Sequence, residues 1–329
     1  MGFDPTERVP LGARGLEVTR LGLGTAPIGG LYEAVTDDAA AATIAQAVDA
    51  GMRFFDTAPQ YGHGLAETRL GRGLTALPRD EIVIATKVGR LLRELPYTDS
   101  VRYYHGTPDV NPIFDFSEQG VLRSVAESLK RLALDRVDVL HIHDPDEHYD
   151  EAAGVAFRAL ERLRDEGAIR AIGAGMNQSA MLARLAREAD FDCFLLAGRY
   201  TLLDHDALAE LLPLCAERGI SIIAGGVYNS GLLADPKPGA PFNYTAVDEA
   251  RLERALALKA VCDRHGVPLK AAAIQFPLAH PAVACVVTGA RSAGELAENV
   301  AMLQVEIAAD VWSELRAERL LPEEAPTPA

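Results

Sequence analysis

Apolar residues in this chain gather in short runs that are separated by longer amphipathic stretches. Each run is nearly continuous rather than alternating, which is typical of parallel strands that are covered on both faces. We expect eight such strands, at residues 21–26, 53–56, 82–86, 137–143, 169–173, 193–197, 221–225 and 283–288. The amphipathic stretches between them predict helices, among them 37–50 (capped by Thr36 or Asp37), 67–74, 119–132, 154–166 and 206–218.

Strands and helices therefore alternate along the chain, with one unit about every 30–40 residues, which favours a closed (β/α)8 barrel. Before the first of these strands, residues 9–19 predict a β-hairpin with a glycine-rich turn. No stretch has the composition of a linker, so we expect one domain over residues 1–321. The Pro- and Glu-containing tail 322–329 is expected to be disordered.

Two loops that follow strands, 88–116 and 227–247, are longer than is usual in a compact domain. Loops of this length often form lids or walls of a binding site. They carry polar and aromatic residues that suit a pocket: Tyr103, Tyr104, His105, Tyr228, Asn229, Phe242 and Tyr244. A surface loop with exposed aromatic residues is the alternative interpretation.

The negative net charge of the chain bears on which classes of molecule it can bind. The net charge is −15, and no Lys/Arg run or basic–aromatic stripe is present. Nucleic acid and anionic membranes are therefore not expected partners, and we expect a small-molecule substrate and a monomer or weak homo-oligomer. Four scattered cysteines, no secretion-signal pattern and no apolar run of membrane-spanning length indicate a reduced, cytoplasmic location.

Candidate chemistry collects at three of the predicted strand ends. Asp56 ends one strand and Tyr61 lies on the loop that follows it, while Lys87 and His143 stand at the ends of two later strands. In a parallel barrel these ends share one rim, where active sites form. Each residue alone has a structural interpretation, such as a helix cap, a snorkelling lysine or a packed loop tyrosine. The combination of all four predicts a site.

The four side chains are chemically complementary. A phenol has a pKa of about 10, too high for acid–base work near neutrality, but a neighbouring ammonium lowers it. Lys87 could supply that charge, and Asp56 could hold the lysine protonated. His143 could orient a substrate oxygen and share a proton with Tyr61. We therefore predict one acid–base unit with Tyr61 as its proton-transfer group.

The pair His141 and His143 supports a different class of function. Two histidines at i and i+2 on a barrel strand point to one side, as in metal-dependent hydrolases. The later predicted strand ends, Gly173, Ala197, Gly225 and Thr288, offer no further ligands, so we expect no metal site.

The set Asp56, Tyr61, Lys87 and His143 resembles the catalytic tetrad of the aldo-keto reductases. The motifs that carry the resemblance are Phe-Phe-Asp-Thr-Ala-x-x-Tyr-Gly, Ala-Thr-Lys-Val and Ile-His-x-Pro, and it extends over nearly the whole chain. Within the family, the stretches from Gly24 to Gly30 and from Asp56 to Gly64 resemble members that oxidise aldoses or pyridoxal. The resemblance implies oxidation of a cyclic hemiacetal to a lactone, with a nicotinamide cofactor. Some relatives are non-catalytic channel subunits, which leaves a regulatory role as an alternative.

The resemblance also implies cofactor contacts. Asn177 matches a contact to the carboxamide, Ser230, Gly231 and Leu232 match the loop over the pyrophosphate, and a helix amino terminus suits phosphate. The full set of implied cofactor residues is Gly24, Thr25, Asn177, Ser230, Gly231, Leu232, Gly289, Arg291, Ser292, Glu295, Glu298 and Asn299.

Three departures from the family pattern bear on the cofactor. Gly225 stands where many relatives place an aromatic residue that stacks on the nicotinamide, and Ala197 stands in place of a glutamine. Glu295 occupies a position where NADP-selective members carry arginine. A carboxylate repels a 2′-phosphate, so we expect NAD(P) with a preference for NAD, although Arg291 argues the other way.

Overall fold

Eight parallel strands close into a barrel in the computed structural model, which describes residues 2–94, 103–242 and 245–328. Neighbouring strands are consecutive around the barrel, and β14 closes it by pairing with β3. The barrel strands are β3 (Leu21–Gly24), β4 (Phe54–Asp56), β5 (Val83–Val88), β8 (Val139–His143), β9 (Ala171–Met176), β10 (Cys193–Ala197), β11 (Ser221–Gly225) and β14 (Val283–Gly289). The predicted (β/α)8 barrel is confirmed.

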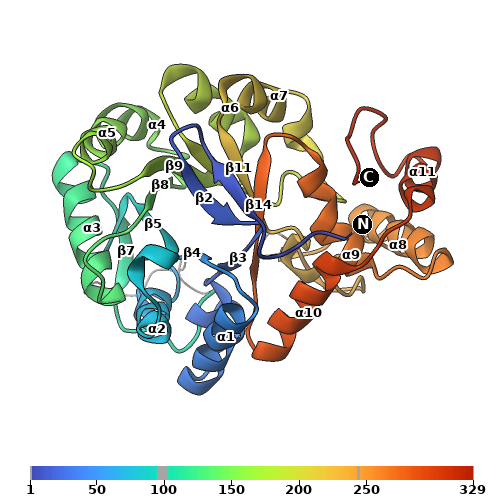
Figure 1. Cartoon of the computed structure of the whole chain (residues 1–329), viewed down its shortest axis with the longest axis horizontal. Helices are drawn as coiled ribbons and strands as arrows, with labels where there is room; N and C mark the ends of the chain where they lie inside the picture. Colours follow the sequence, from blue (N-terminus) through green and yellow to red (C-terminus); the bar gives the residue numbers. More distant parts are fainter. Residues whose placement is uncertain (1, 95–102, 243–244, 329) are drawn as a thin grey trace.

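Helices surround the barrel on its outer side (Figure 1). They are α1 (Asp37–Asp49), α2 (Leu65–Leu74), α3 (Glu118–Leu132), α4 (Tyr149–Glu151), α5 (Phe157–Asp165), α6 (Ser179–Glu188), α7 (Leu211–Arg218), α8 (Glu249–Arg264), α9 (Leu269–Gln275), α10 (Ala293–Gln304) and α11 (Ala309–Ala317). Local sequence sets their starts: the hydroxyl of Thr36 accepts a hydrogen bond from the Ala39 N–H at the start of α1. No helix among these described segments is long and apolar enough to cross a bilayer.

The core has two parts. One lies between the barrel and its helices. The other lies inside the barrel, where Phe54, Val139 and Cys285 pack against Val9 and Leu16 of an N-terminal hairpin. This hairpin, β1 (Arg8–Leu11) with β2 (Leu16–Thr19), has the predicted position. It covers the end of the barrel at which the strands begin, which leaves the carboxyl ends of the strands as the accessible rim.

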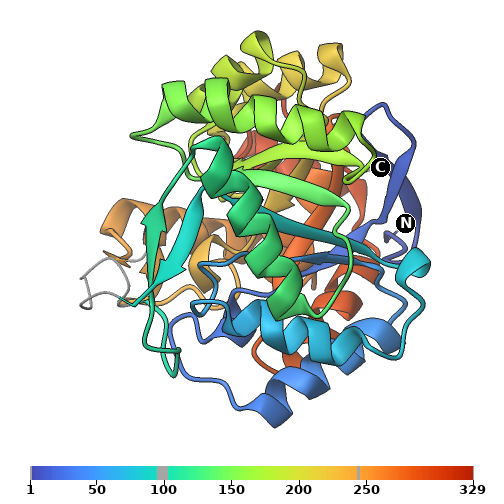
Figure 2. The same cartoon turned by 90° about the vertical axis from the view of Figure 1, so that its left-hand side faces the viewer.

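The two long loops lie at that opposite rim and contain structure of their own. The first forms a second hairpin, β6 (Arg90–Arg93) with β7 (Asn111–Phe114), and Figure 2 shows it on the side away from β1–β2. The second contains β12 (Pro241–Phe242) and β13 (Thr245–Ala246). Tyr244, which was expected to line a pocket, lies outside the described residues.

Three boundaries differ from the sequence prediction. Strand β9 continues to Met176 rather than ending at Gly173, because its last residues still pair with β8 and β10 although their side chains are small. The helix expected over 154–166 begins only at Phe157, after a wider π-helical turn over Ala152–Ala156. The helix expected over 206–218 is divided, and α7 begins at Leu211.

The carboxyl-terminal segment packs on α11, which differs from the expected disorder. Ala325 is buried, and Arg316 donates hydrogen bonds to the Ala325 carbonyl (2.7 Å) and to the Thr327 hydroxyl (3.1 Å). The composition of this segment is that of a flexible tail, and the Arg316 guanidinium, nine residues before Ala325, binds its backbone.

Candidate active site

The four predicted catalytic residues meet at the carboxyl ends of adjacent strands. Asp56 is the last residue of β4, Lys87 is the penultimate residue of β5, and His143 ends β8. Tyr61 follows on the loop after β4 and is half-buried. Three consecutive strands of the barrel thus place these side chains at one side of its mouth.

Lys87 and Asp56 form a buried ion pair. The lysine Nζ donates to both carboxylate oxygens of Asp56, at 2.7 and 2.8 Å, and to the carbonyl of Thr57 at 2.9 Å. The two side chains are 1% and 3% exposed. All three protons of the ammonium have an acceptor, which fixes its position.

Tyr61 and His143 lie next to this ion pair. The Nζ of Lys87 is 4.7 Å from the centroid of the Tyr61 ring, and the His143 ring meets the Tyr61 ring edge-on, with centroids 5.9 Å apart. Tyr104 from the first long loop lies 6.4 Å from Tyr61, between ring centroids. The structure therefore brings together a carboxylate, an ammonium, a phenol and an imidazole, with one of the predicted loop aromatics beside them.

Burial determines the protonation of the groups around the phenol. Desolvation raises the pKa of the Asp56 carboxyl, while the Lys87 ammonium opposes that rise. The pKa of His143 is lowered well below its ordinary value, first by burial and then by the positive charges of Arg90 and Lys87. His143 is therefore a neutral imidazole near neutrality, which can donate one hydrogen bond and accept another.

His141 lies inside the barrel and not at its rim. It is completely buried, and neither ring nitrogen has a hydrogen-bond partner among the described residues. A Cβ on Gly173 would lie 2.2 Å from the Nδ1 of His141, so the imidazole needs glycine on the neighbouring strand. Within the described ranges no group of three or more His, Cys, Asp or Glu side chains is arranged to hold a metal ion.

Two residues beside the site were not predicted. The Asp144 carboxylate accepts a hydrogen bond from Arg90 (3.0 Å) and lies 3.5 Å from the Nε2 of His143. Asp144 follows His143 directly in the sequence, and that adjacency was the available signal. Arg90 belongs to β6, and nothing in its sequence context indicates which strand end it reaches.

The predicted cofactor residues on β3 and β14 lie beside Asp56. Gly24 pairs with Asp56 on one side and with Gly289 on the other. The backbone N–H of Thr25 donates to the Asp56 carbonyl at 2.9 Å, while its buried hydroxyl has no partner in the described part of the chain. The Asn299 side chain reaches the Gly289 carbonyl at 3.5 Å. These residues are contiguous with the four catalytic candidates.

The other predicted cofactor residues come from two loops and the start of α10. Asn177 directly follows β9, because that strand extends further than expected. Its side chain is half-buried. In the Ser230–Leu232 turn, Ser230 (φ 60°) and Gly231 (φ 100°) both have left-handed backbones, and Leu232 is buried. Apart from Gly231 and its chain neighbours, no heavy atom of the described residues lies within 4 Å of the position of a Cβ on Gly231. The backbone of this turn is therefore open on that side.

At the start of α10, the charged side chains of Arg291 and Glu295 bind each other. The Ser292 hydroxyl caps the Glu295 N–H, and the Glu295 carboxylate accepts a hydrogen bond from the Arg291 N–H at 2.9 Å. The Arg291 guanidinium is 2.8 Å from Glu295 and 3.1 Å from Glu33. Although burial works against charge on Glu295, the hydrogen bonds from Arg291 hold its pKa below the ordinary value. Glu298, one turn later, pairs with Lys270 at 2.5 Å.

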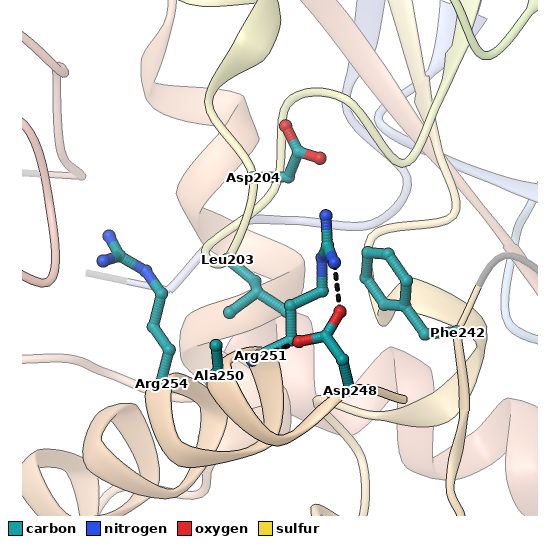
Figure 3. Close-up of a pocket in the computed structure, with 7 residues that line it drawn as sticks. All are labelled: Leu203, Asp204, Phe242, Asp248, Ala250, Arg251 and Arg254. Carbon is teal, nitrogen blue, oxygen red and sulfur yellow. Dashed lines mark hydrogen bonds and ion pairs between the residues drawn. The ribbon is translucent and has the colours of Figure 1, made fainter. Parts of the chain in front are cut away.

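A separate cavity of about 470 Å³ lies at the start of α8 (Figure 3). It is lined by Leu203, Asp204, Phe242, Asp248, Ala250, Arg251 and Arg254, none of which is a predicted site residue. Arg251 is paired with Asp248, and its guanidinium lies 4.8 Å from the centre of the Phe242 ring. Phe242 therefore lines this cavity, away from the four catalytic candidates.

Comparison with known proteins agrees with this geometry. The Aldo/keto reductase family profile matches residues 20–318. The chain is 46% identical to a D-threo-aldose 1-dehydrogenase of a Pseudomonas species, over 94% of this chain and 97% of that protein. It is 40% identical to the pyridoxal 4-dehydrogenase of Microbacterium luteolum, over 98% and 100% of the two chains.

Among solved structures, the holo form of an aldo-keto reductase from Bacillus halodurans superimposes with a TM-score of 0.75 at 25% identity, covering 97% of this chain and 99% of that one. The metal-dependent hydrolase alternative is therefore wrong, because both sequence and fold match another family over almost their full length. The chain belongs to the aldo/keto reductase family and is an oxidoreductase.

Proposed function

We propose that this enzyme oxidises the cyclic hemiacetal of an aldose, of the L-fucose or D-threo-aldose type, to a lactone with NAD(P) as the hydride acceptor. The observation that carries the proposal is the cluster of Tyr61, His143 and the buried Lys87–Asp56 pair at the barrel mouth. The 46% identity to a D-threo-aldose 1-dehydrogenase over nearly both full lengths supports the choice of substrate class.

In this direction the phenolate of Tyr61 removes the proton of the anomeric hydroxyl. The Lys87 ammonium stands 4.7 Å from the ring centroid, and a nearby positive charge favours the phenolate over the phenol. Asp56 keeps that ammonium in place through two hydrogen bonds. The imidazole of His143 orients the substrate oxygen without taking its proton, because burial lowers the pKa of the ring and makes it a poor base.

The residues at the rim fit a nicotinamide cofactor. The buried Thr25 hydroxyl has no partner in the described residues, and the backbone of Gly231 is open on one side. We propose that Gly24, Thr25, Asn177, the Ser230–Leu232 turn, Gly289 and the residues at the start of α10 hold the cofactor, which supplies the hydride acceptor.

The preference proposed within the NAD(P) class is for NAD. A 2′-phosphate needs a free cation, but the Arg291 guanidinium is already bound by Glu295 and Glu33. The Glu295 carboxylate would also repel the phosphate, whereas a 2′-hydroxyl can donate a hydrogen bond to it.

Gly225 on β11 has no aromatic side chain, so that strand offers the nicotinamide no ring on which to stack.

Oxidation of pyridoxal is the second candidate function, because a pyridoxal 4-dehydrogenase is 40% identical over essentially the whole chain. Its substrate is also a cyclic hemiacetal in the ring-closed form, so the same acid–base unit serves both reactions. The alternative of a non-catalytic regulatory subunit is less well supported, since all four candidate side chains are present and in contact.

The test is a substrate panel with purified protein, followed by the appearance of NADH or NADPH. L-Fucose, D-arabinose, L-galactose and pyridoxal are compared at equal concentrations with each nucleotide. We expect kcat/KM for at least one aldose to exceed that for pyridoxal. A higher value for pyridoxal would transfer the assignment to the second candidate. Nucleotide binding without turnover of any of the four would contradict the proposed function.

A further inference from the structure

Asp144 has an unusual backbone conformation directly after the catalytic strand β8. Its φ is +42°, in the left-handed region that residues other than glycine, asparagine and aspartate seldom adopt. The turn is held by the Asp144 N–H, which donates to the Gly175 carbonyl of β9 at 3.0 Å. This turn keeps the Asp144 carboxylate at the barrel mouth, next to the end of β8.

Two side chains determine where that carboxylate points. Arg90 donates a hydrogen bond to its Oδ2 at 3.0 Å, and the Nε2 of His143 lies 3.5 Å from the same oxygen. The Arg90 guanidinium also lies 4.4 Å from the centre of the Phe114 ring. The Asp144 side chain is 35% exposed. Arg90 and His143, the two side chains of the described residues that contact this carboxylate, both lie against Oδ2, so Oδ1 is available to a ligand at the rim.

We propose that Asp144 determines substrate specificity by accepting a hydrogen bond from the hydroxyl next to the reacting carbon, which is the C2 hydroxyl of an aldose. This inference rests on the proposed function. In the proposed function His143 orients the oxygen on the reacting carbon, and the Asp144 Oδ2 lies 3.5 Å from the Nε2 of that imidazole. The hydroxyl nearest the anomeric oxygen in a sugar ring is the one on C2.

The chemistry of the group fits a polyhydroxylated substrate. A carboxylate only accepts hydrogen bonds, and a hydroxyl that donates to it forms a short, charge-assisted bond. In pyridoxal the ring carbon next to the reacting carbon has no hydroxyl, and the nearest hydroxyl is the phenolic one a carbon further on, so its donor lies at a different position from the C2 hydroxyl of an aldose. Asp144 therefore favours aldoses over pyridoxal within the same acid–base machinery.

A purely structural role for Asp144, as an anchor for Arg90 and the β6–β7 hairpin, predicts a different result. Loss of an anchor would lower the rate with every substrate to a similar degree. Loss of a contact to one hydroxyl would lower the rate only with substrates that carry that hydroxyl. Comparison of a sugar with its 2-deoxy analogue separates the two roles.

The experiment measures kcat/KM for L-fucose and for 2-deoxy-L-fucose with the full-length enzyme and NAD. We expect the wild type to prefer L-fucose by about tenfold to a hundredfold, the range for a hydrogen bond to a charged group. Asp144→Asn suits the left-handed backbone, but Arg90 binds its carbonyl oxygen and an NH₂ group then faces the ligand. Asp144→Gly also suits the backbone and removes the side chain. Both variants should reduce the preference to about threefold or less, through the loss of activity with L-fucose.

The control is Asp138→Asn. Asp138 is another buried carboxylate bound by an arginine, Arg79 at 2.7 Å, but it lies at the opposite end of β8. This variant should keep the wild-type preference. Oxidation of L-fucose with an equal preference in wild type and both Asp144 variants, or a wild-type preference near one, would overturn the assignment of Asp144 alone. If the wild type oxidises neither of these sugars nor any other aldose of the panel, the proposed function fails and this inference fails with it.

Discussion

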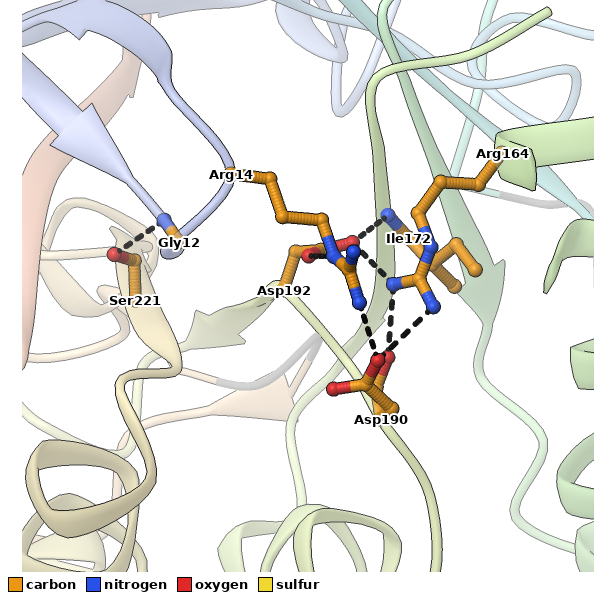
Figure 4. A network of polar contacts seen from close by, with 7 residues as sticks. All are labelled: Gly12, Arg14, Arg164, Ile172, Asp190, Asp192 and Ser221. Atoms are coloured by element: carbon orange, nitrogen blue, oxygen red, sulfur yellow. Dashed lines mark hydrogen bonds and ion pairs between the residues drawn. The ribbon is translucent and has the colours of Figure 1, made fainter. Parts of the chain in front are cut away.

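The two ends of the barrel use buried charge in different ways. At the amino-terminal end, beneath the hairpin, both carboxylate oxygens of Asp192 are bound (Figure 4). One accepts from Arg14 at 3.0 Å, and the other accepts from Arg164 at 2.7 Å and from the Ile172 N–H at 2.8 Å. The carboxylate joins the hairpin, a helix and the barrel, and a second hairpin contact from the Gly12 N–H to the Ser221 hydroxyl lies nearby.

The same arrangement occurs again two strands away. The Asp138 carboxylate accepts from Arg79 at 2.7 Å and from the Ile84 N–H at 2.8 Å. In both cases an aspartate directly before a barrel strand accepts from the N–H of the second residue of a neighbouring strand and from an arginine outside the barrel. Loss of such an aspartate is costly because it leaves the buried arginine without its partner.

At the carboxyl-terminal end, several buried polar groups have no hydrogen-bond partner among the described residues. Lys87 and Asp56 satisfy each other, but three buried threonine hydroxyls and the Nδ1 of His143 have no partner in the described residues. The threonines are Thr25, Thr57 and Thr288. A buried polar atom without a partner is costly unless a ligand or water completes it. We infer that the carboxyl-terminal end is the one that binds a ligand, because its unpartnered hydroxyls lie next to the four catalytic candidates.

The largest expected effect is at the carboxyl-terminal end. Tyr61→Phe removes the ionisable oxygen and keeps the ring, so kcat should fall by about 10²-fold or more, as for a lost acid–base group. Because the rest of the site is unchanged, nucleotide affinity measured by fluorescence titration should stay near the wild-type value. Unfolding free energy should change by about 1 kcal/mol or less. At least half of the wild-type turnover in this variant would exclude Tyr61 as the base.

The corresponding change at the amino-terminal end should affect stability and not activity. Asp192→Asn leaves the buried Arg164 without its closest carboxylate, which should cost about 3 kcal/mol in unfolding free energy. This lies at the lower end of the usual range because Asp190 still contacts both Arg14 and Arg164. Urea denaturation measures the loss, and kcat under native conditions should match the wild type. A large fall in kcat without loss of stability would contradict the division between the two ends.

His141 should give a smaller effect that depends on pH. Burial and the Lys87 charge hold its pKa well below the ordinary value of 6.5. Below pH 6.5 the unfolded chain therefore binds a proton that the folded chain does not, and stability falls as the pH is lowered. His141→Leu removes this contribution, so stability should decline less steeply below pH 6.5, by an amount that approaches about 1.4 kcal/mol per pH unit near pH 5. Parallel curves for wild type and variant would show that His141 is protonated to the same extent in both states.

The smallest effect is expected at the cofactor end of the site, where charges are partly exposed. Glu295→Arg removes the carboxylate that binds Arg291 and adds a cation, so it should shift the ratio of kcat/KM for NAD over NADP towards NADP. The change should be about 1 kcal/mol, or on the order of tenfold, at low salt. Most of it should appear in KM for NADP. An unchanged ratio would mean that Glu295 acts only as a helix-capping residue and that the preference is set elsewhere.

The sequence by itself determined the order of strands and helices and the place of the four catalytic candidates. Near-continuous apolar runs mark buried parallel strands, and Asp56, Lys87 and His143 stand at the ends of such runs. Since the ends of parallel strands in a closed barrel share one rim, these residues had to be neighbours. Local rules also predicted the cap at Thr36 and the hairpin over 9–19, because both depend on residues close in the chain.

Only the tertiary structure decided which polar groups are paired. Asp144 meets Arg90 across 54 residues of sequence, and Arg14 reaches Asp192 across 178. The carboxyl-terminal tail is ordered by Arg316, although its composition indicates disorder. The contacts of Arg90 and Arg14 depend on the direction of a long side chain after the barrel has closed. Sequence periodicity gives the face on which a residue lies, but it does not give the partner that lies opposite.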